Sequence, residues 1–462
     1  MENNKVEIRE FISILGQSKI AFIGVGVSHT AAIKMFARNG AQVQALDKRE
    51  LDESLRREFE ALGVVCRSGN DYLGKLDADI YFRTPGLPFD SEIIREIRRN
   101  GKIVTSELEV FFKLCRGKII GVTGSDGKTT TTTLIYKLLQ QMGKEVYIGG
   151  NIGLPLLSRV EEIHRGSFVV VELSSFQLES MCVSPDIAVV TNISENHLNV
   201  HGSMENYINA KKNVFLHQDG FSRVVLNANC IYAPEFERAA RGQVTFFGGD
   251  AAVCCEDGVL FVDGKSVLKT QEFRLKGAHN LQNLMAAVAA TKEWVTPEAI
   301  CSVATSFPGV EHRIEFCGKI NDADCFNDSV ATTPGRTMAC IRAFTCPVVL
   351  IVGGSSKGLD YQELGDVIAQ QVKCLIVTGA TGPIIKKATE GSRYFDSTVI
   401  FEAKDLECAV GYASKKCLQS GDVLLFSPAS ASFDRYKNFV ERGEHFKRIV
   451  SELNKKNGEW GV

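Results

Sequence analysis

The sequence predicts an α/β protein of three domains. The chain has 462 residues, which is enough for about three domains of ordinary size. Short apolar runs that suit buried parallel strands alternate with segments of helical periodicity, and glycine-rich turns follow several of these runs. We place the domains at residues 1–107, 108–308 and 309–462, with Rossmann-like sheets in the first and third and a P-loop-type ATPase sheet in the second.

Composition and charge argue against several classes of protein. A hydrophobic content of 44% supplies large cores, and a formal net charge of −2 gives no reason to expect a nucleic-acid partner or a membrane surface. No apolar run reaches the roughly 18 residues of a membrane span, and the polar stretch Met1–Glu10 is no secretory signal. The 14 cysteines are scattered without a Cys-x-x-Cys pair, so we interpret them as small buried side chains in a reducing cytoplasm rather than zinc ligands. We expect a monomer, because no heptad pattern is evident.

The first domain opens with a strand and a glycine-rich turn at Lys19–Gly26. A helical pattern at Ala31–Arg38 and a second strand at Gln42–Leu46 follow, and Asp47 stands at the end of that strand. This order is similar to a dinucleotide-binding fingerprint, but His29 occupies the place of its third glycine. A lone Gly-x-Gly is weak support for NAD, because the same turn binds any nucleotide diphosphate.

The second domain is organised around a predicted strand, Ile119–Val122, that runs into a glycine-rich turn and a helix. The turn has glycines at three-residue spacing, which are Gly121, Gly124 and Gly127. The backbone N–H groups of such a turn and the start of the helix together cradle phosphate. Lys128 would reach the outer phosphates, and the Thr129 hydroxyl would bind Mg²⁺. A strict P-loop has glycine where Val122 stands, so a tight turn without a ligand is the alternative.

Functional side chains follow the next predicted strands of this domain. Glu172 ends the apolar run Ser167–Val171, at the position where nucleotide-hydrolysing sheets place Mg²⁺ ligands. His197 lies in the loop after the strand Asp186–Thr191, and we interpret it as a metal ligand or phosphate contact, although a lone histidine is usually structural. Lys211 lies on a predicted helix, where composition alone would leave it on the surface.

The second domain ends in a small antiparallel region and a helix. Two Asp-Gly steps predict hairpins within residues 222–275, and an alanine-rich helix is expected at Leu284–Val295. Asn280 and Asn283 stand one helical turn apart at its start. Capping explains Asn280, but two amides together suit the edge of a purine.

The third domain repeats the α/β alternation after a boundary near Phe307–Gly309. Its predicted strands are Pro347–Val352, Cys374–Thr378 and Asp422–Phe426, and an amphipathic helix is expected at Phe439–Leu453. Polar loops follow the first and last of these strands, at 353–357 and 427–432. Because open α/β sheets bind ligands at the carboxyl ends of their strands, both loops are candidate binding sites.

Together these motifs resemble the Mur ligases of peptidoglycan synthesis. The resemblance rests on Gly121–Thr129, Gly149–Gly153, Glu172–Glu179, Asn280–Asn283, His312-Arg313, Asn327–Ser329 and Ser427–Asp434. It implies three α/β domains, which hold a UDP-sugar, ATP and an incoming amino acid, and it accounts for the shifted glycine of the phosphate turn. The combination is similar to the member that adds D-glutamate to UDP-N-acetylmuramoyl-L-alanine. We therefore expect an ATP-dependent ligase that forms an amide bond through an acyl phosphate in cytoplasmic precursor synthesis.

The resemblance also implies a role for each matching residue. ATP is expected at Gly124, Ser125, Asp126, Gly127, Lys128, Thr129, Thr130, Asn280, Asn283, Arg313 and Asp328. Mg²⁺, at two sites, is expected at Thr129, Glu172, His197 and a carbamylated Lys211, and the expected catalytic residues are Lys128, His197 and Lys211. The UDP-linked substrate is expected at Gly24, Val25, Gly26, Val27, Ser28, Asp47 and Asn151. D-Glutamate is expected at Thr332, Lys357, Ser432 and Phe439.

Two departures from the family pattern concern charge. Val330 stands where the family usually carries lysine, so a cation near the substrate carboxylates is either absent or replaced by Arg336 or Lys357. Asp126 replaces the commoner asparagine beside the phosphates. The alternatives to the expected activity are a ligase that adds L-lysine or diaminopimelate to the next precursor or glutamate to folate, a non-catalytic nucleotide-binding protein, and an NAD-dependent oxidoreductase.

Overall fold

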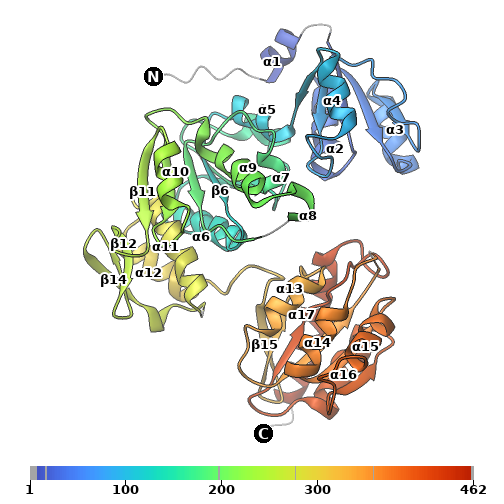
Figure 1. Cartoon of the computed structure of the whole chain (residues 1–462), viewed down its shortest axis with the longest axis vertical. Coiled ribbons are helices and arrows are strands. Elements are labelled where there is room, and N and C mark those ends of the chain that lie inside the picture. The colour runs from blue at the N-terminus through green and yellow to red at the C-terminus, as the bar shows by residue number, and fades with distance from the viewer. Residues whose placement is uncertain (1–7, 16–17, 196–197, 276, 357, 459–462) are drawn as a thin grey trace. The chain divides into compact units, whose positions relative to one another are not determined.

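The computed structural model describes residues 8–15, 18–195, 198–275, 277–356 and 358–458. The chain forms two compact units, residues 1–307 and residues 308–462, which Figure 1 colours from blue to yellow and from orange to red. The first unit contains two β-sheets and the second contains one. Helices alternate with mostly parallel strands in all three, so the predicted α/β fold class is confirmed.

The first sheet has five parallel strands in the order β3-β2-β1-β4-β5. Its strands are β1 (Lys19–Ile23), β2 (Gln42–Asp47), β3 (Val65–Ser68), β4 (Ile80–Arg83) and β5 (Ile103–Thr105). The helices of this part are α1 (Ile8–Leu15), α2 (Val27–Arg38), α3 (Glu53–Ala61) and α4 (Glu92–Arg99). The strand order reverses between β1 and β4, which is where sheets of this kind bind ligands beyond the carboxyl ends of their strands.

The second sheet has nine strands in the order β14-β13-β12-β11-β10-β9-β6-β8-β7. Its parallel part comprises β6 (Lys118–Thr123), β7 (Val146–Gly150), β8 (Phe168–Glu172), β9 (Ile187–Val190), β10 (Arg223–Asn227) and β11 (Gln243–Phe247). The antiparallel edge comprises β12 (Val253–Glu256), β13 (Val259–Val262) and β14 (Lys265–Lys269). The two predicted Asp-Gly turns join these three edge strands, and both aspartates have positive φ, at 46° for Asp257 and 48° for Asp263.

Helices surround the second sheet and position its loops (Figure 1). They are α5 (Glu107–Leu114), α6 (Lys128–Gln141), the short η1 (Leu157–Glu162), α7 (Ser175–Leu178), α8 (Leu198–His201), α9 (Met204–Leu216), α10 (Ala233–Ala239), η2 (Thr270–Glu272), α11 (Ala278–Thr291) and α12 (Pro297–Ser306). Helix α11 ends at Thr291 and not at the predicted Val295. The reason is that Thr296 caps the start of α12 in an extended conformation, which ends the preceding helix first.

The sheet of the second unit has the order β15-β16-β20-β17-β18-β19. Its strands are β15 (Glu315–Ile320), β16 (Ala323–Asn327), β17 (Val348–Gly353), β18 (Val372–Thr378), β19 (Val399–Glu402) and β20 (Val423–Phe426), and only β15 is antiparallel to its neighbour. Its helices are α13 (Pro334–Ile341), α14 (Gln362–Gln371), α15 (Gly382–Glu390), α16 (Leu406–Tyr412), η3 (Ala413–Cys417) and α17 (Phe439–Gly458). All residues of β17 and β20 are buried, which is the pattern of a parallel sheet covered on both faces.

No helix in the described part of the chain is long and apolar enough to cross a membrane.

Candidate active site

The turn between β6 and α6 has a conformation that requires its glycines. Gly124 has φ 149° and Gly127 has φ 75°, in the region that residues with a Cβ avoid. A Cβ on Gly124 would overlap Thr191 Oγ1, and one on Gly127 would overlap Asn283 Oδ1. The turn is therefore packed tightly from two sides, and the first residue of the helix that follows it is Lys128.

The segment 191–194, which follows β9, holds this turn in place. The Ser125 N–H donates to Asn192 O at 2.9 Å, and the Asp126 N–H donates to Asn192 Oδ1 at 2.8 Å. Ser125 Oγ donates to Ser194 O and accepts from the Ser194 N–H, both at 2.9 Å. These bonds fix the backbone between Gly124 and Gly127 before any ligand arrives.

Two lysines converge on the carbonyl oxygen of Gly124. Lys128 Nζ donates to Gly124 O at 3.0 Å and to Ser125 O at 2.8 Å. Lys211 Nζ donates to the same Gly124 O at 2.6 Å. The region around the turn therefore carries two cationic side chains from helices α6 and α9, which suits a site for a polyphosphate.

Lys211 is buried, which the sequence could not reveal. Only 2% of the residue is exposed, and its Nζ lies 4.7 Å from the centre of the Tyr207 ring. The Tyr207 hydroxyl is 2.9 Å from Ser125 Oγ, so one face of α9 braces the turn. Burial, with a smaller contribution from repulsion by Lys128, holds the pKa of Lys211 well below its ordinary value. A larger fraction of this amine is consequently neutral and nucleophilic than in an ordinary lysine.

Glu172, on the strand next to β6, has a buried carboxylate oxygen that accepts no hydrogen bond from the described residues. Strand β8 pairs with β6 so that Glu172 lies opposite Val122, two residues before Gly124. Glu172 Oε1 accepts from Asn151 Nδ2 at 2.8 Å, whereas no described residue donates a hydrogen bond to the buried Oε2. An unsatisfied buried carboxylate oxygen is costly, and a metal ion is a usual reason for one.

The donor set fits Mg²⁺ on chemical grounds. Glu172 supplies a carboxylate oxygen and Thr129, in the first turn of α6, supplies a hydroxyl. No group of three His, Cys, Asp or Glu side chains within the described residues is arranged around a metal. Mg²⁺ does not need one, because it is usually held by one or two carboxylates, substrate phosphates and waters.

The two asparagines at the start of α11 lie against the phosphate turn. Asn283 is buried, and its Oδ1 is 3.4 Å from Thr131 Oγ1 on α6. Asn283 Nδ2 is 3.5 Å from Asn280 Oδ1, so the two amides form one pair. Asn283 thus packs on Gly127, and Asn280 extends the polar surface outward from it.

A second candidate site lies in the first unit, where a cavity of about 210 Å³ begins at the Gly-rich turn after β1. Its lining residues are Gly26, Val27, Ser28, His29, Arg83, Thr84, Pro85, Ser106, Glu107, Leu108 and Gln177. Three of them, Gly26, Val27 and Ser28, are residues that the sequence assigns to the UDP-linked substrate. Gln177 lies on α7, the short helix that follows β8, so a loop region of the second sheet also lines this cavity.

Asp47 fastens the turn beside this cavity. Asp47 Oδ2 accepts from the Val25 N–H at 2.6 Å, and its Oδ1 accepts from the Arg49 N–H at 2.8 Å. These bonds outweigh the effect of burial and lower the pKa of Asp47. Gly24, with φ 84°, completes the turn, and its carbonyl oxygen accepts a hydrogen bond from His29 Nδ1 at 2.6 Å.

In the second unit, Arg442 joins two loops that contain residues expected to bind D-glutamate, Thr332 in one and Ser432 in the other. The loop 328–332 contributes Ser329, whose O and Oγ accept from the Arg442 guanidinium at 2.9 Å and 3.1 Å. The loop 427–432 contributes the carbonyls of Ser430 and Ala431, both at 3.0 Å from Arg442 Nη1. Ser329 Oγ also donates to Phe439 O at 2.7 Å. The segments that contain Thr332, Ser432 and Phe439 are therefore tied to one another.

Asp328 lies at the base of the same two loops. Its Oδ2 accepts from Ser427 Oγ at 2.8 Å and its Oδ1 from the Ile314 N–H at 3.3 Å. Burial raises the pKa of Asp328 to about 6, although Ser427 counteracts this effect. Arg313 precedes Ile314 in the chain, and its positive charge, like the bond from Ser427, lowers the pKa of Asp328.

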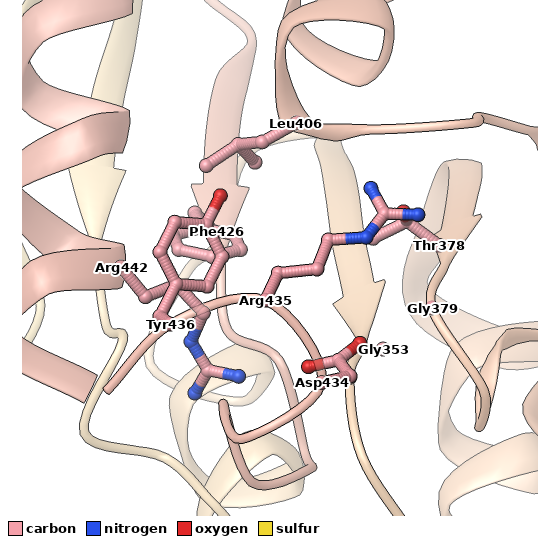
Figure 2. A pocket seen from close by; sticks show the side chains of 10 residues that line it. Gly353, Thr378, Gly379, Leu406, Phe426, Asp434, Arg435, Tyr436 and Arg442 are labelled. Carbon is pink, nitrogen blue, oxygen red and sulfur yellow. The ribbon is translucent and has the colours of Figure 1, made fainter. Parts of the chain in front are cut away.

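Figure 2 shows a small pocket at the carboxyl ends of β17, β18 and β20 in this unit. Asp434 and Arg435 line it together with Gly353, Thr378 and Gly379. Its volume of about 20 Å³ is close to the minimum for one water molecule. The pocket is thus too small for an amino acid in this conformation.

Two family models match the chain and together cover more than half of it. The model of the Mur ligase middle domain matches residues 122–291, and the model of the Mur ligase, glutamate ligase domain matches residues 312–430. The chain belongs to the Mur ligase family. Its phosphate turn, Glu172 and Lys211 lie in the first matched range, and Asp328 lies in the second.

Curated relatives resemble this Mur ligase over almost its whole length. A protein of Acetivibrio thermocellus is 44% identical over 97% of this chain and 99% of its own length. A protein of Clostridium botulinum strain Alaska E43 is 42% identical over 97% of this chain and all of its own length. Both are named UDP-N-acetylmuramoylalanine–D-glutamate ligase.

Solved structures of other family members share the fold. The UDP-N-acetylmuramate–alanine ligase of Thermotoga maritima has a TM-score of 0.56 at 19% identity and covers 95% of this chain, which in turn covers all of that structure. MurF of Acinetobacter baumannii has a TM-score of 0.58 at 17% identity, with coverage of 94% of this chain and 93% of that one. At such identities the likeness concerns the fold alone.

Many of the residues that the sequence assigns to the functional site lie close together at the phosphate turn, and two lie outside the described residues. The structure brings together Gly124, Ser125, Asp126, Gly127, Lys128, Thr129, Thr130, Asn151, Glu172, Lys211, Asn280 and Asn283 around the carboxyl end of β6. His197 and Lys357 lie outside the described residues. Arg313, Asp328, Thr332, Ser432 and Phe439 belong to the second unit.

Sequence reasoning missed residues that act through long-range contacts. Thr191, Asn192, Ser194 and Tyr207 hold the phosphate turn, Arg83 and Gln177 line the cavity of the first unit, and Arg442 joins the loops of the second. For residues 192–194, the sequence offered one signal of a functional role, which is their position directly after the end of a predicted strand. Nothing local distinguishes Arg442 from the other basic residues of α17.

Proposed function

We propose that this chain forms the amide bond between the alanyl carboxyl of UDP-N-acetylmuramoyl-L-alanine and the amine of D-glutamate, with hydrolysis of ATP to ADP and phosphate. The names of the relatives at 42–44% identity support the choice of substrates. The observation that carries the chemistry is the orphaned Glu172 Oε2 beside a phosphate turn on which Lys128 and Lys211 converge.

The first step joins the substrate carboxylate to the γ-phosphate. The carboxylate oxygen attacks phosphorus in line, the bond from phosphorus to the bridging oxygen breaks, and ADP leaves with an acyl phosphate formed on the substrate. Lys128 exchanges its bonds to Gly124 O and Ser125 O for the outer phosphate oxygens. Thr129 and Glu172 would hold Mg²⁺, which supplies positive charge to the phosphates when it is bound.

The second step consumes the acyl phosphate. The neutral amine of D-glutamate attacks the acyl carbon, the bond from carbon to the phosphate oxygen breaks, and inorganic phosphate leaves as the amine loses a proton. His197 is the proposed general base for that proton. Thr332, Lys357, Ser432 and Phe439 are the proposed D-glutamate residues.

The cation that the family usually carries at Val330 has a candidate replacement nearby. Arg336 Nη1 lies 3.3 Å from Val330 O, so a guanidinium stands beside the position of the usual lysine. Lys357 is the other candidate. We propose that Arg313 and Asp328 contact the nucleotide from the second unit.

Lys211 is proposed to be carbamylated. Its buried amine has a lowered pKa, and a neutral amine adds to CO₂ to give a carbamate with release of one proton. The charge of Lys211 also interacts with Glu172, so the two groups are near enough for the carbamate to contribute to a second Mg²⁺ site. The amine in its present position donates to Gly124 O, and the carbamate N–H could retain that bond.

Three further proposals complete this account. The domains are placed at residues 1–107, 108–308 and 309–462, the protein is a monomer, and it acts in the cytoplasm, where the UDP-linked precursors are made. Besides the two substrates, its proposed small-molecule requirements are ATP, Mg²⁺ and the CO₂ that carbamylates Lys211.

Product analysis tests the proposed function. The purified protein is incubated with UDP-N-acetylmuramoyl-L-alanine, ATP, Mg²⁺ and D-glutamate, and the nucleotide-linked product is identified by mass spectrometry. A product enlarged by one glutamyl residue is expected. Glu172→Gln, which keeps the bond from Asn151 but weakens the metal ligand, should need more Mg²⁺ for half-maximal rate, whereas Glu161→Gln, on the surface of η1, should not. An unchanged substrate with every amino acid tried would contradict the proposal.

A further inference from the structure

The cavity of the first unit contains an arginine that no sequence motif assigns. Arg83 ends strand β4, lines the cavity, and is only 1% exposed. A guanidinium keeps its charge at any physiological pH, and a buried charge is costly unless another charge or a ligand compensates it. The position of this charge therefore requires a reason.

Within the described part of the chain, the hydrogen bonds of Arg83 all go to neutral groups. Nη1 donates to Leu87 O at 2.7 Å, and Nη2 donates to Phe176 O at 2.8 Å and to Ser180 Oγ at 2.9 Å. The buried Nε has no hydrogen-bond partner among the described residues. No described carboxylate forms an ion pair with this arginine, and Glu179 and Glu109 attract it only at longer range.

Two other titratable side chains line the cavity, His29 and Glu107, and neither provides a full negative charge that would compensate Arg83 near neutral pH. Burial lowers the pKa of His29 to about 4, so its imidazole is neutral. Burial raises the pKa of Glu107 to about 7, so its carboxyl is partly protonated near neutral pH. Arg83 is thus the one permanent charge among the residues that line this cavity.

The backbone adds positive potential in the same place. Gly26 is the N-cap of α2, a helix of 12 residues, and the positive end of a helix dipole favours an anion. Gly26, Val27 and Ser28 line the cavity together with Arg83. The volume of about 210 Å³ is below the roughly 300–1,000 Å³ of a site for a complete drug-sized ligand. The cavity therefore suits one anionic part of a larger molecule.

We propose that Arg83 binds the diphosphate of the UDP-linked substrate in this cavity and supplies the charge that makes the cavity selective for an anion. This inference rests on the proposed function and deepens it. The same guanidinium holds the backbone of Phe176, so it also fixes the neighbouring Gln177 at the cavity wall. A diphosphate oxygen would give the orphaned charge of Arg83 the partner that the protein itself does not provide.

Calorimetric binding of UDP and of uridine to the complete chain, without ATP, tests this inference. Arg83→Met is expected to weaken UDP binding at least about tenfold, which corresponds to about 1.4 kcal/mol, and to leave uridine binding almost unchanged. The matched control is Arg223→Met, which removes another buried arginine of the same unit, one that bonds to Ala290 O and Glu293 outside the cavity. UDP binding by this control should equal that of the unaltered protein.

Arg83→Lys provides a second variant if Arg83→Met does not fold. It keeps the charge but cannot make the same three bonds, so we expect UDP affinity between that of the unaltered protein and that of a variant without the charge. Added salt should weaken UDP binding by the unaltered protein more than it weakens uridine binding.

The outcomes separate this inference from the proposed function. Equal UDP affinity in Arg83→Met and the unaltered protein would overturn the role of Arg83 and leave the ligase intact. An equal loss of UDP and uridine affinity would also overturn it, because the loss would then not concern the anion. Absence of UDP binding in the unaltered protein would contradict the proposed function itself.

Discussion

Replacing Glu107 with glutamine should abolish a pH dependence of stability that this single carboxyl creates. Glu107 is 8% exposed, and its Oε1 accepts from the Leu157 N–H at 2.9 Å. Burial raises the pKa of Glu107 from 4.5 to about 7, and the bond from Leu157 opposes this rise only in part. Glutamine can offer the same acceptor oxygen to Leu157 but cannot ionise.

The direction follows from proton binding. Because the folded state binds this proton more tightly than the unfolded chain, the contribution to stability is complete below about pH 4.5 and is lost as the pH rises to about 7. The shift of about 2.5 pKa units corresponds to at most about 3.4 kcal/mol, at 1.36 kcal/mol per unit. Glu107→Gln should therefore gain stability relative to the unaltered protein as the pH rises, by up to that amount above about pH 7.

Urea unfolding of both proteins between about pH 5 and about pH 8 measures this difference. Glu161→Gln, in which an exposed glutamate of η1 is changed, is the control and should show a nearly constant difference from the unaltered protein. A difference between Glu107→Gln and the unaltered protein that stays constant over this range would refute the reasoning. So would a relative loss of stability as the pH rises.

Three other substitutions have expected outcomes that follow from the geometry of the site. Lys211→Met should lower the rate of phosphate release by about 100-fold or more. With carbon-13-labelled bicarbonate, the unaltered protein should show a carbamate signal, and the absence of that signal in Lys211→Met would assign it to Lys211. A rate near that of the unaltered protein would remove this lysine from the mechanism. Gly127→Ala should lose nucleotide affinity, measured by fluorescence of a labelled ATP analogue, because its Cβ would overlap Asn283 Oδ1 and φ is 75°; normal affinity would show that the turn can relax. Arg442→Met should destabilise the second unit by about 3 kcal/mol or more, because buried carbonyls of Ser430 and Ala431 lose their donor; urea unfolding measures this loss, and a change below about 1 kcal/mol would contradict it.

The elements around the phosphate turn were predictable because their signals are local. The strand expected at Ile119–Val122 is β6, Lys118–Thr123, and the helix expected after Gly127 begins at Lys128. A buried parallel strand is a continuous apolar run, and a glycine at positive φ follows from its missing Cβ. Each of these properties can be recognised from a few adjacent residues.

The contacts that complete the site could not be predicted, because they join residues that are distant along the chain. Asn192 holds Asp126 across 66 positions, and Arg442 reaches Ser329 across 113. The burial of Lys211 depends in the same way on how α9 packs against the turn, since a lysine on a helix is ordinarily exposed. Composition shows that these residues are polar, but only the packing of the helices on the sheet decides which of them become buried.

Phosphate release from ATP tests the central claim most directly. The purified chain is supplied with Mg²⁺ and UDP-N-acetylmuramoyl-L-alanine, and D-glutamate, L-glutamate, L-lysine and diaminopimelate are added in parallel reactions. We expect release that requires both the UDP-linked substrate and D-glutamate, with little release from any other amino acid. Release with another amino acid but not with D-glutamate would contradict the proposed acceptor, and no release with any of them, even with added bicarbonate, would contradict the ligase activity.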